Sequence, residues 1–429
     1  TSDGGEITVK LTEGSVGFTV GDEFTFSTTA GTVVGETLTL TETGADTGIF
    51  EGSIEFSTGS ATAGNSKLEV ASGDHVMVFY DDPKGDWGHA LQVRDEALYA
   101  ATVIKGSTYM QDMVWTKDDS PYLVTGDVTI SSGRSLTIKE GVKVIFLANS
   151  DSTEGGEQKY DSELLVEGSI SVLGTEAEPV VFTSSEAAPS KGDWGGIKYK
   201  QAGVFEYAEL DYSGYGIYAY FRESNESQCK IEVKNTKIRH SGGYAIRVNG
   251  NNRHPGVTIE DNEFIDIAGD NEGIAVYIGG DWTPHADAVI RRCKFINSSS
   301  GGIAFHSQGA GIIEGNEFLN NGTVNIQIWH PRGNFTVKDN VLKNNKRGEI
   351  RVYNPQGGNL SFLVEENIIS ESDNGEMYGI RIDECNLDFE ILVKNNTVET
   401  RYDGIRIHGN FNLTPKITGN TIVGTRLES

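Results

Sequence analysis

The sequence contains few cysteines, methionines and prolines: 3, 4 and 9 among 429 residues. Cys229, Cys293 and Cys385 cannot all pair within one chain, and their spacing fits no metal site. This excludes a disulfide-stapled framework and a cysteine-based metal centre. The 53 glycines, together with abundant Ser, Thr and Asn, instead suit strands joined by turns.

Basic residues and long apolar runs are also scarce. There are 35 Lys and Arg against 62 Asp and Glu, a formal net charge of −27. Such a chain repels polyanions, so nucleic acid and anionic membranes are not expected as partners. No apolar run is long enough to span a bilayer, so no membrane insertion is expected. A strongly acidic chain can, however, recruit divalent cations.

The second half of the chain has no sustained helical stripe but repeats one short phrase. An Asn, or Cys293 in one case, precedes a small apolar group every 23 to 31 residues, a period that indicates stacked repeats. The positions are Asn235, Asn262, Cys293, Asn316, Asn340, Asn367, Asn396 and Asn420. We expect Cys293 to act as a small buried apolar residue.

Two further phrases lie between these positions. One resembles Gly-Ile-x-Ile, as at Gly302-Ile-Ala-Phe and Gly379-Ile-Arg-Ile. The other begins with a phenylalanine, at Phe335, Phe362 and Phe389. Each alternates apolar with polar residues, as a strand with one buried face does. Three short strands per repeat cannot bury their apolar faces alone, so the repeats are expected to stack as coils.

This pattern resembles the right-handed parallel β-helix of pectate lyases and many bacterial surface proteins. The resemblance covers residues 121–429, beginning with phrases such as Leu136-Thr-Ile-Lys and Leu164-Leu-Val-Glu. It implies an all-β fold of about eleven coils and a buried asparagine ladder. The chain begins at Thr1 without a signal peptide, and the resemblance implies a mature secreted protein.

Residues 1–104 show short alternating strands separated by Gly, Thr and Asp turns, which favours an antiparallel β-sandwich. The phrase Thr41-Glu-Thr-Gly-Ala-Asp-Thr-Gly resembles immunoglobulin-like modules of surface-layer and adhesin proteins. Residues 105–120 are expected to form a linker.

The second strand of each coil predicts an outward stripe. With Ile246, Ile274, Ile303 and their equivalents inward, period-two alternation exposes two rows. They are Arg247, Ala275, Ala304, Gln327, Arg351, Arg381 and Arg406, then Asn249, Tyr277, His306, Trp329, Tyr353, Asp383 and His408.

Arg and aromatic side chains together suit an acidic polysaccharide or an acidic protein patch. The candidate ligand-binding residues are Tyr277, Trp329, Arg351, Tyr353, Arg381 and Arg406. The alternative is that neighbouring coils neutralise each other, for example Asp383 between Arg381 and Arg406.

A catalytic use of this stripe would need an acid or base beside a charge stabiliser. His306, Tyr353 and His408 are the candidates, with Arg351 or Arg381 polarising a uronate carboxylate. The sequence lacks the Arg-x-Pro-x-x-Arg of pectate lyases and the Gly-His-Gly of polygalacturonases. The chain is therefore not expected to be an enzyme, and a polysaccharide lyase, hydrolase or epimerase is the alternative.

Calcium is the one cofactor that the sequence suggests. Asp81, Asp82 and Asp86 place three carboxylates in one short segment, and Ca²⁺ prefers such oxygen ligands. Their spacing differs from that of an EF-hand, and a solvated acidic turn is the alternative.

These features favour an extracellular or cell-surface protein that is structural or adhesive: a surface-layer, filament or adhesin subunit, with polysaccharide as a candidate ligand. Asn420 begins another coil close to Ser429, and an uncovered coil exposes unpaired backbone groups. The expectation is that the native chain continues or that a second copy or another surface protein covers this edge.

Overall fold

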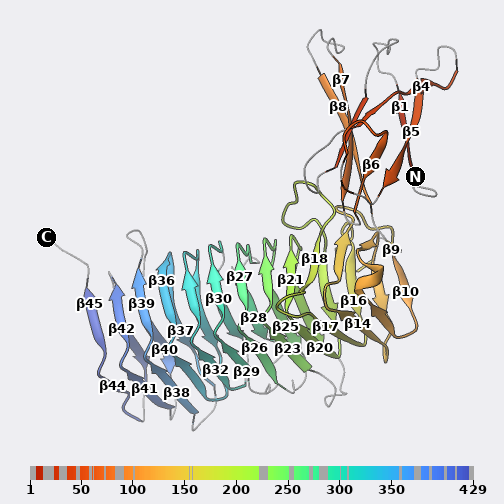
Figure 1. Cartoon of the computed structure of the whole chain (residues 1–429). Coiled ribbons are helices and arrows are strands. Elements are labelled where there is room, and N and C mark those ends of the chain that lie inside the picture. Colours follow the sequence, from red (N-terminus) through yellow and green to blue (C-terminus); the bar gives the residue numbers. More distant parts are fainter. Residues whose placement is uncertain are drawn as a thin grey trace. The chain divides into compact units, whose positions relative to one another are not determined.

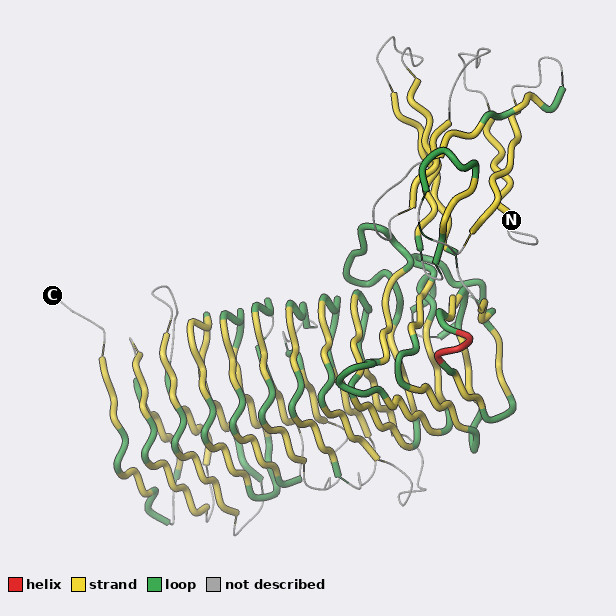
Figure 2. Tube along the Cα trace, viewed as in Figure 1, coloured by secondary structure: helices red, strands yellow, loops and turns green. Residues whose placement is uncertain are grey.

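A computed structural model gives the structure of the chain. It describes residues 6–12, 24–28, 36–44, 49–57, 60, 62–71, 74–82, 91–99, 102–153, 155–156, 158–221, 230–250, 256–269, 274–279, 288–299, 301–306, 309–356, 360–371, 378–385, 389–400, 403–410 and 413–424. Contacts divide the chain into two units, Thr1–Thr102 and Val103–Ser429. Strands dominate both, with one short 3₁₀ helix, η1 (Lys117–Asp119), among the described residues (Figure 2).

The first unit contains two four-stranded sheets. One consists of β1 (Glu6–Thr12), β4 (Thr41–Glu42), β5 (Ile49–Ser57) and β6 (Lys67–Glu69). The other consists of β2 (Phe24–Thr28), β3 (Glu36–Leu38), β7 (His75–Asp82) and β8 (Leu91–Leu98). Ile54 and Leu68 of the first sheet share a buried cluster with Val76 and Val78 of the second.

The second unit is a solenoid of three parallel sheets, whose successive strands are visible in Figure 1. Sheet 1 contains β10 (Ser107–Tyr109), β13 (Val128–Ile130), β16 (Glu163–Val166), β19 (Gly196–Tyr199), β22 (Ile217–Phe221), β25 (Ile246–Gly250), β28 (Val276–Gly279), β31 (Ile303–His306), β34 (Val324–Trp329), β37 (Arg347–Tyr353), β40 (Ile380–Cys385) and β43 (Ile405–Gly409).

Sheet 2 contains β11 (Met113–Trp115), β14 (Ser135–Lys139), β17 (Ser169–Leu173), β20 (Ala202–Glu206), β23 (Lys230–Lys234), β26 (Val257–Glu260), β29 (Ala288–Arg291), β32 (Gly311–Glu314), β35 (Phe335–Lys338), β38 (Leu360–Glu365), β41 (Phe389–Lys394) and β44 (Lys416–Thr418). Sheet 3 contains β9 (Thr102–Ile104), β12 (Tyr122–Val124), β15 (Lys143–Phe146), β18 (Val180–Ser184), β21 (Ala208–Asp211), β24 (Lys237–Arg239), β27 (Glu263–Ile265), β30 (Lys294–Ile296), β33 (Glu317–Leu319), β36 (Val341–Asn345), β39 (Ile368–Glu371), β42 (Thr397–Thr400) and β45 (Thr421–Gly424).

The solenoid begins earlier than the sequence predicted. Two sheets have 12 strands and the third has 13, where about eleven coils were expected. The difference arises because β10 and β11 pair in parallel with β13 and β14. Residues 105–120, predicted as a linker, are therefore part of the first coil. Their strands have only three residues each, too short for a clear alternation in the sequence.

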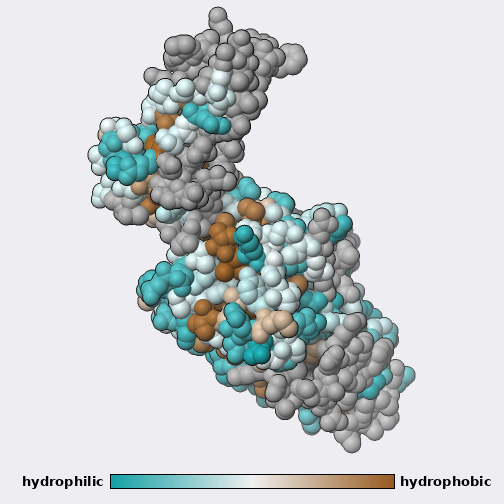
Figure 3. Space-filling model, turned by 90° about the vertical axis from the view of Figure 1, so that its right-hand side faces the viewer, coloured by the Kyte–Doolittle hydropathy of each residue, from teal (hydrophilic) through white to brown (hydrophobic). Residues whose placement is uncertain are grey.

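One apolar core runs through the solenoid, because each strand turns alternate side chains inward. Aromatic rings stack from coil to coil within it: the ring centroids of Phe295 and Phe318 lie 4.7 Å apart and nearly parallel. Outside, apolar surface occurs as small separate patches on the side shown in Figure 3. Exposed apolar residues of the first coil include Val103, Met110 and Val114.

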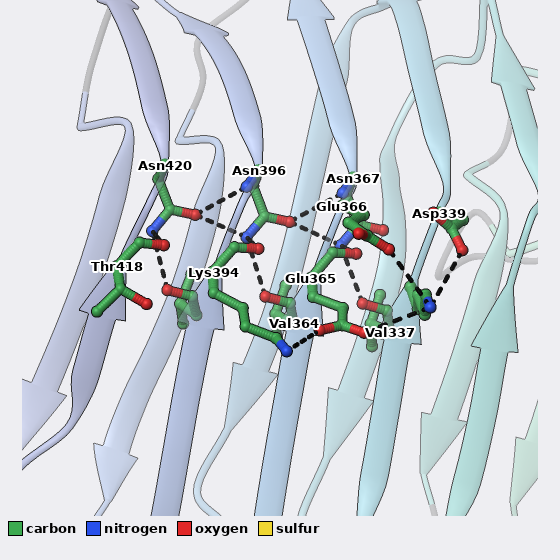
Figure 4. A network of polar contacts seen from close by, with 12 residues as sticks. Val337, Asp339, Val364, Glu365, Glu366, Asn367, Lys394, Asn396, Thr418 and Asn420 are labelled. Atoms are coloured by element: carbon green, nitrogen blue, oxygen red, sulfur yellow. Dashed lines mark hydrogen bonds and ion pairs between the residues drawn. The ribbon is translucent and has the colours of Figure 1, made fainter.

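A buried amide ladder joins the coils at the turn from sheet 2 to sheet 3 (Figure 4). At most rungs the main-chain N–H donates to the side-chain oxygen of the next rung, at 2.8–3.0 Å. The rungs are Thr236, Asn262, Cys293, Asn316, Asn340, Asn367, Asn396 and Asn420. The ladder is thus confirmed, with Thr236 rather than Asn235 as its first member.

The residue before each rung, and not the rung itself, has the left-handed conformation. Its φ lies between 49° and 68° at Asn235, Asp261, Arg292, Gly315, Asp339, Glu366, Asn395 and Gly419. Asn235 was misplaced because a left-handed Asn and a ladder Asn look the same in sequence. The rung residue supplies amide hydrogen bonds, while its neighbour makes the sharp turn.

A second, shorter ladder lies at the other end of sheet 3. The N–H of Ser298 donates to Asn321 Oδ1 at 3.0 Å, and the N–H of Asn321 donates to Asn345 Oδ1 at 2.9 Å. The Nδ2 groups of Asn321 and Asn345 donate to the carbonyls of Phe295 and Phe318. Buried polar groups are therefore paired at both ends of these strands.

Cys293 is the weak rung of the main ladder. Asn262 Nδ2 reaches its Sγ only at 3.8 Å, whereas Asn316 Nδ2 donates to Asn340 Oδ1 at 2.9 Å. Burial raises the pKa of Cys293 to about 12, so the group is a neutral thiol. The expected role as a small buried residue is confirmed, and Cys385 is likewise buried and free.

Replacing Cys293 by Asn is expected to raise the free energy of unfolding by about 1–2 kcal/mol, because two stronger hydrogen bonds would form. The new amide would accept from Asn262 and donate to the carbonyl of Ile259, which the thiol now meets at 3.6 Å. Urea denaturation measures the change. Cys385→Asn is the control and should destabilise, because it buries an amide outside the ladder. A less stable Cys293→Asn variant would contradict this account.

Candidate functional site

The outward side of the last five strands of sheet 1, β31 to β43, carries Arg, His and aromatic side chains. We call this surface the arginine face. Register places Gln327, Arg351, Arg381 and Arg406 opposite one another in one row. His306, Trp329, Tyr353, Asp383 and His408 form the second row, two residues further along each strand.

Three arginines stand on three successive coils, and each contacts an aromatic ring. The Arg351 guanidinium lies 5.4 Å from the centroid of the Tyr353 ring. Arg381 and Arg406 share Tyr378, at 4.9 and 5.7 Å. The side chains of these arginines are between 24% and 39% exposed, so ring contacts hold them while part of each remains in solvent.

Two buried carboxylates compensate part of this charge. Asp383 receives a hydrogen bond from Arg381 and lies 3.8 Å from Arg406 Nε. Glu349 lies 3.9 Å from Arg351 Nε and is 6% exposed. The neutralisation between coils that the sequence offered as an alternative is therefore present. It leaves three guanidinium groups against two buried carboxylates.

Glu349 is a feature that the sequence reasoning missed. Burial raises its pKa, while the charges of Arg351 and Arg381 act in the opposite direction. One of its oxygens and both amide atoms of Asn325, on the preceding coil, are buried without a hydrogen-bond partner among the described residues. Such polar groups are costly to bury unpaired, and they mark this part of the solenoid as unusual.

Aromatic rings in the second row contact one another edge to face. The rings of His306 and Trp329 are 5.3 Å apart and nearly perpendicular, and His306 lies 5.7 Å from His330. Tyr353 donates a hydrogen bond to Glu384 at 2.9 Å, which raises the pKa of Tyr353. His306, Tyr353 and His408 occupy one row, but other coils separate them.

One coil of the predicted stripe was misaligned. Val276, and not Ile274, lies opposite Ile246, so Tyr277 belongs to the first row beside Arg247, and Ala275 belongs to neither row. The sequence led to the wrong register because Gly273-Ile-Ala-Val and Gly302-Ile-Ala-Phe look alike. The structure pairs Val276 with Ile303.

The stripe also extends further back than predicted. Lys198, Tyr218, Arg247 and Tyr277 are successive neighbours in the first row. Arg247 lies 5.1 Å from the ring centroid of Tyr218 and 5.8 Å from that of Tyr277. The sequence already shows this alternation of cationic and aromatic residues at Lys198, Tyr218 and Arg247, but the predicted stripe began only at Arg247.

The calcium prediction falls partly outside the described residues. Asp81 and Asp82 end β7 and belong to a strand rather than a turn, and Asp86 lies in a segment that is not described. In the described parts of the chain, no three His, Cys, Asp or Glu side chains are grouped to hold a metal ion. Calcium at these residues stays a prediction.

A cleft of about 230 Å³ lies away from the arginine face, at the turn between sheets 2 and 3 in earlier coils. Glu176, Tyr207, Glu209, Lys237 and Glu263 are among its lining residues. Glu209 and Lys237 form an ion pair at 3.1 Å, and Lys294 pairs with Glu263 at the same distance. The carboxylates of Glu209 and Glu263 are therefore already paired with lysines.

Comparisons with known proteins agree with this geometry. Residues 215–375 match the family model of the right-handed beta helix region, and residues 107–204 match the pectate-lyase-like beta helix domain. The second unit is therefore a right-handed parallel β-helix. No curated protein matches the chain. None of the described residues forms a helix long and apolar enough to cross a membrane.

One solved structure resembles the chain, that of the Streptococcus pneumoniae surface protein and adhesin PfbA. The alignment covers 76% of this chain and 92% of that chain, with 12% identity and a TM-score of 0.22.

Proposed function

We propose that this is an extracellular, cell-surface protein with a structural or adhesive role, whose arginine face binds an acidic polysaccharide or an acidic patch of a partner protein. The observation that carries the proposal is the column of Arg351, Arg381 and Arg406 on successive coils beside aromatic rings. Guanidinium groups bind carboxylates or sulfates in a fork, and Tyr and Trp rings pack against sugars.

In this proposal the first unit acts as a spacer or connector. Two four-stranded sheets with a shared buried cluster support a β-sandwich of the immunoglobulin-like kind. Such modules commonly space or connect surface domains. Self-assembly, or association with another surface protein, completes the proposed structural role.

Acidic glycans are expected to bind the full chain, and Arg406→Ala is expected to weaken that binding about tenfold, the usual size for one charge-assisted contact. Arg406 suits the test because, when it is removed, the buried Asp383 is still paired with Arg381. Isothermal titration with polygalacturonate, alginate and a glycosaminoglycan measures the affinity, with dextran as the neutral comparison.

Arg134→Ala is the matched control, since it removes one exposed arginine from an early turn of the solenoid. It should leave the affinity unchanged. Equal binding of wild type and Arg406→Ala, or equal binding of dextran and the acidic glycans, would remove the arginine face as the site.

The second candidate function is a polysaccharide lyase, hydrolase or epimerase. Glu349 favours it, because a buried carboxyl with a raised pKa beside Arg351 and Arg381 could exchange a proton with a bound uronate. His306, Tyr353 and His408 are the other acid or base candidates. A rise in ultraviolet absorbance from unsaturated products during the same titrations would assign a lyase.

A further inference from the structure

The position just before the first inward residue of sheet 1 is small in most coils. Register places Gly196, Gly216, Ala245, Ala275, Gly302, Gly379 and Gly404 there. Two pairs of adjacent coils depart from this rule. One is Asn325 and Glu349 beside the arginine face, and the other is Asp127 and Glu163 in early coils.

Asp127 and Glu163 are stacked acids inside the protein. Val128 pairs with Leu164, so the two acids occupy the same place on adjacent coils, which are about 4.8 Å apart. Each is 4% exposed. The N–H of Glu163 donates to Asp127 Oδ1 at 2.8 Å, but Asp127 Oδ2 is buried without a hydrogen-bond partner in the described structure. Two like charges directly opposite each other are destabilising.

Both carboxylates lie close to Gly156, and that of Asp127 also lies close to Gly155. A Cβ built on Gly155 would lie 2.9 Å from Asp127 Oδ2, and one built on Gly156 would lie 3.0 Å from it. The Cβ on Gly156 would also collide with Glu163 Oε2. The unpaired oxygen of Asp127 and the carboxylate of Glu163 therefore converge beneath the segment that contains these glycines.

Asp151 holds that segment in place. Its carboxylate accepts the N–H groups of Thr153 and Gly155, both at 2.9 Å, the hydroxyl of Thr153 at 2.6 Å and the N–H of Asp127 at 3.3 Å. Glu163 Oε2 accepts the N–H of Gln158 at 3.0 Å. The segment is thus tied on both sides to the two buried acids.

Positive charge is scarce around this pair. The sequence from 149 to 163 contains five acidic residues and one basic residue, Lys159. The Lys159 ammonium lies 5.5 Å from the ring centroid of Tyr160. The surroundings of Asp161 are also negative, since the charges of Asp193 and Asp151 add to burial in raising its pKa. The buried, unpaired Asp127 Oδ2 accordingly calls for a proton or a cation.

We propose that Asp127 and Glu163 form a binding site for a divalent cation, Ca²⁺, next to Gly155 and Gly156. Ca²⁺ takes six to eight oxygen ligands in irregular geometry, including carboxylates, main-chain carbonyls and water. Two carboxylates suffice as side-chain ligands when such oxygens complete the shell. Bound Ca²⁺ would join two coils and fix the segment that contains these glycines at once.

A shared proton is the rival account, and its pH dependence differs. Burial, with the nearby charge of Asp151, raises the pKa of Asp127. A raised folded-state pKa means that the metal-free protein binds this proton more tightly than the unfolded chain does. Its stabilising contribution is therefore present at low pH and is lost as pH rises through the folded-state pKa. Ca²⁺ should restore stability at neutral pH.

The test uses the full chain after chelator treatment. Thermal unfolding and isothermal titration at neutral pH are followed with CaCl₂, and with MgCl₂ as comparison. We expect Ca²⁺ at about a hundred times its Kd to raise the Tm by several degrees. Asp127→Asn and Glu163→Gln should each weaken Ca²⁺ binding about tenfold or more. Asp118→Asn, in exposed η1, should leave it unchanged.

Each other outcome overturns the proposal. If wild type shows no Ca²⁺ response but is stabilised by acid, and Asp127→Asn abolishes that effect, the pair shares a proton. If Ca²⁺ raises the Tm equally in wild type, Asp127→Asn and Glu163→Gln, the ion binds elsewhere on this acidic chain. The Asn and Gln variants keep the size of the side chains and remove charge repulsion, so both are expected to fold. Glycan binding at the arginine face is measured separately and does not depend on the result.

Discussion

Replacing Asn340 by Ala is expected to lower the free energy of unfolding by roughly 3–5 kcal/mol, because several buried hydrogen-bonding groups lose their partner at once. Asn340 is completely buried. Its Nδ2 donates to the carbonyl of Ile313 and to Asn367 Oδ1, both at 2.9 Å, and its Oδ1 accepts from the N–H and the Nδ2 of Asn316. Alanine would also leave a cavity between two coils.

Urea denaturation of the full chain measures this loss. Lys343→Ala, an exposed change three residues further along the chain in β36, should shift the midpoint very little. Asn420→Ala should cost less than Asn340→Ala, since Asn420 is only partly buried. If Asn340→Ala and Lys343→Ala unfold at the same urea concentration, the ladder contributes no net stability and its amides merely satisfy each other.

The period and the ladder were readable from sequence because they repeat. A buried amide that must meet another amide one coil away leaves a regular trace at Asn316, Asn340, Asn367 and Asn396. Errors arose where a single coil departs from the rule. Thr236 replaces the first Asn of the ladder, and the short strands β10 and β11 concealed the first coil.

The arginine face was predictable in part for the same reason. Its rows follow from alternation once the inward residue of each coil is known, so Arg351, Arg381 and Arg406 were placed correctly. The buried acid Glu349 was not predicted. It occupies a position that is Gly or Ala in most coils, next to a register shift between Val324 and Ile326. No pattern of alternation reports such local irregularity.

That row of small residues leads to the second large effect. Gly302→Ala is expected to lower the free energy of unfolding by about 2–3 kcal/mol through overpacking. Its new Cβ would collide with Phe318 Cε1 and would lie 2.6 Å from the carbonyl oxygen of Asn325. Phe318 cannot easily move, because it is fully buried and stacked on Phe295 at 4.7 Å. The Asn325 carbonyl belongs to β34 of the neighbouring coil, so relief would require shifting a strand.

Gly242→Ala separates this steric effect from a general effect of removing glycine. A Cβ on exposed Gly242 would come no closer than 3.6 Å to its neighbours, an ordinary contact. It should leave stability unchanged or raise it slightly, since alanine restricts the unfolded chain. Both variants are compared with wild type by urea denaturation. Equal stability of Gly302→Ala and Gly242→Ala would mean that coils can separate enough to admit a side chain. In that case, the small residues at the start of the sheet 1 strands would not be needed to keep adjacent coils in register.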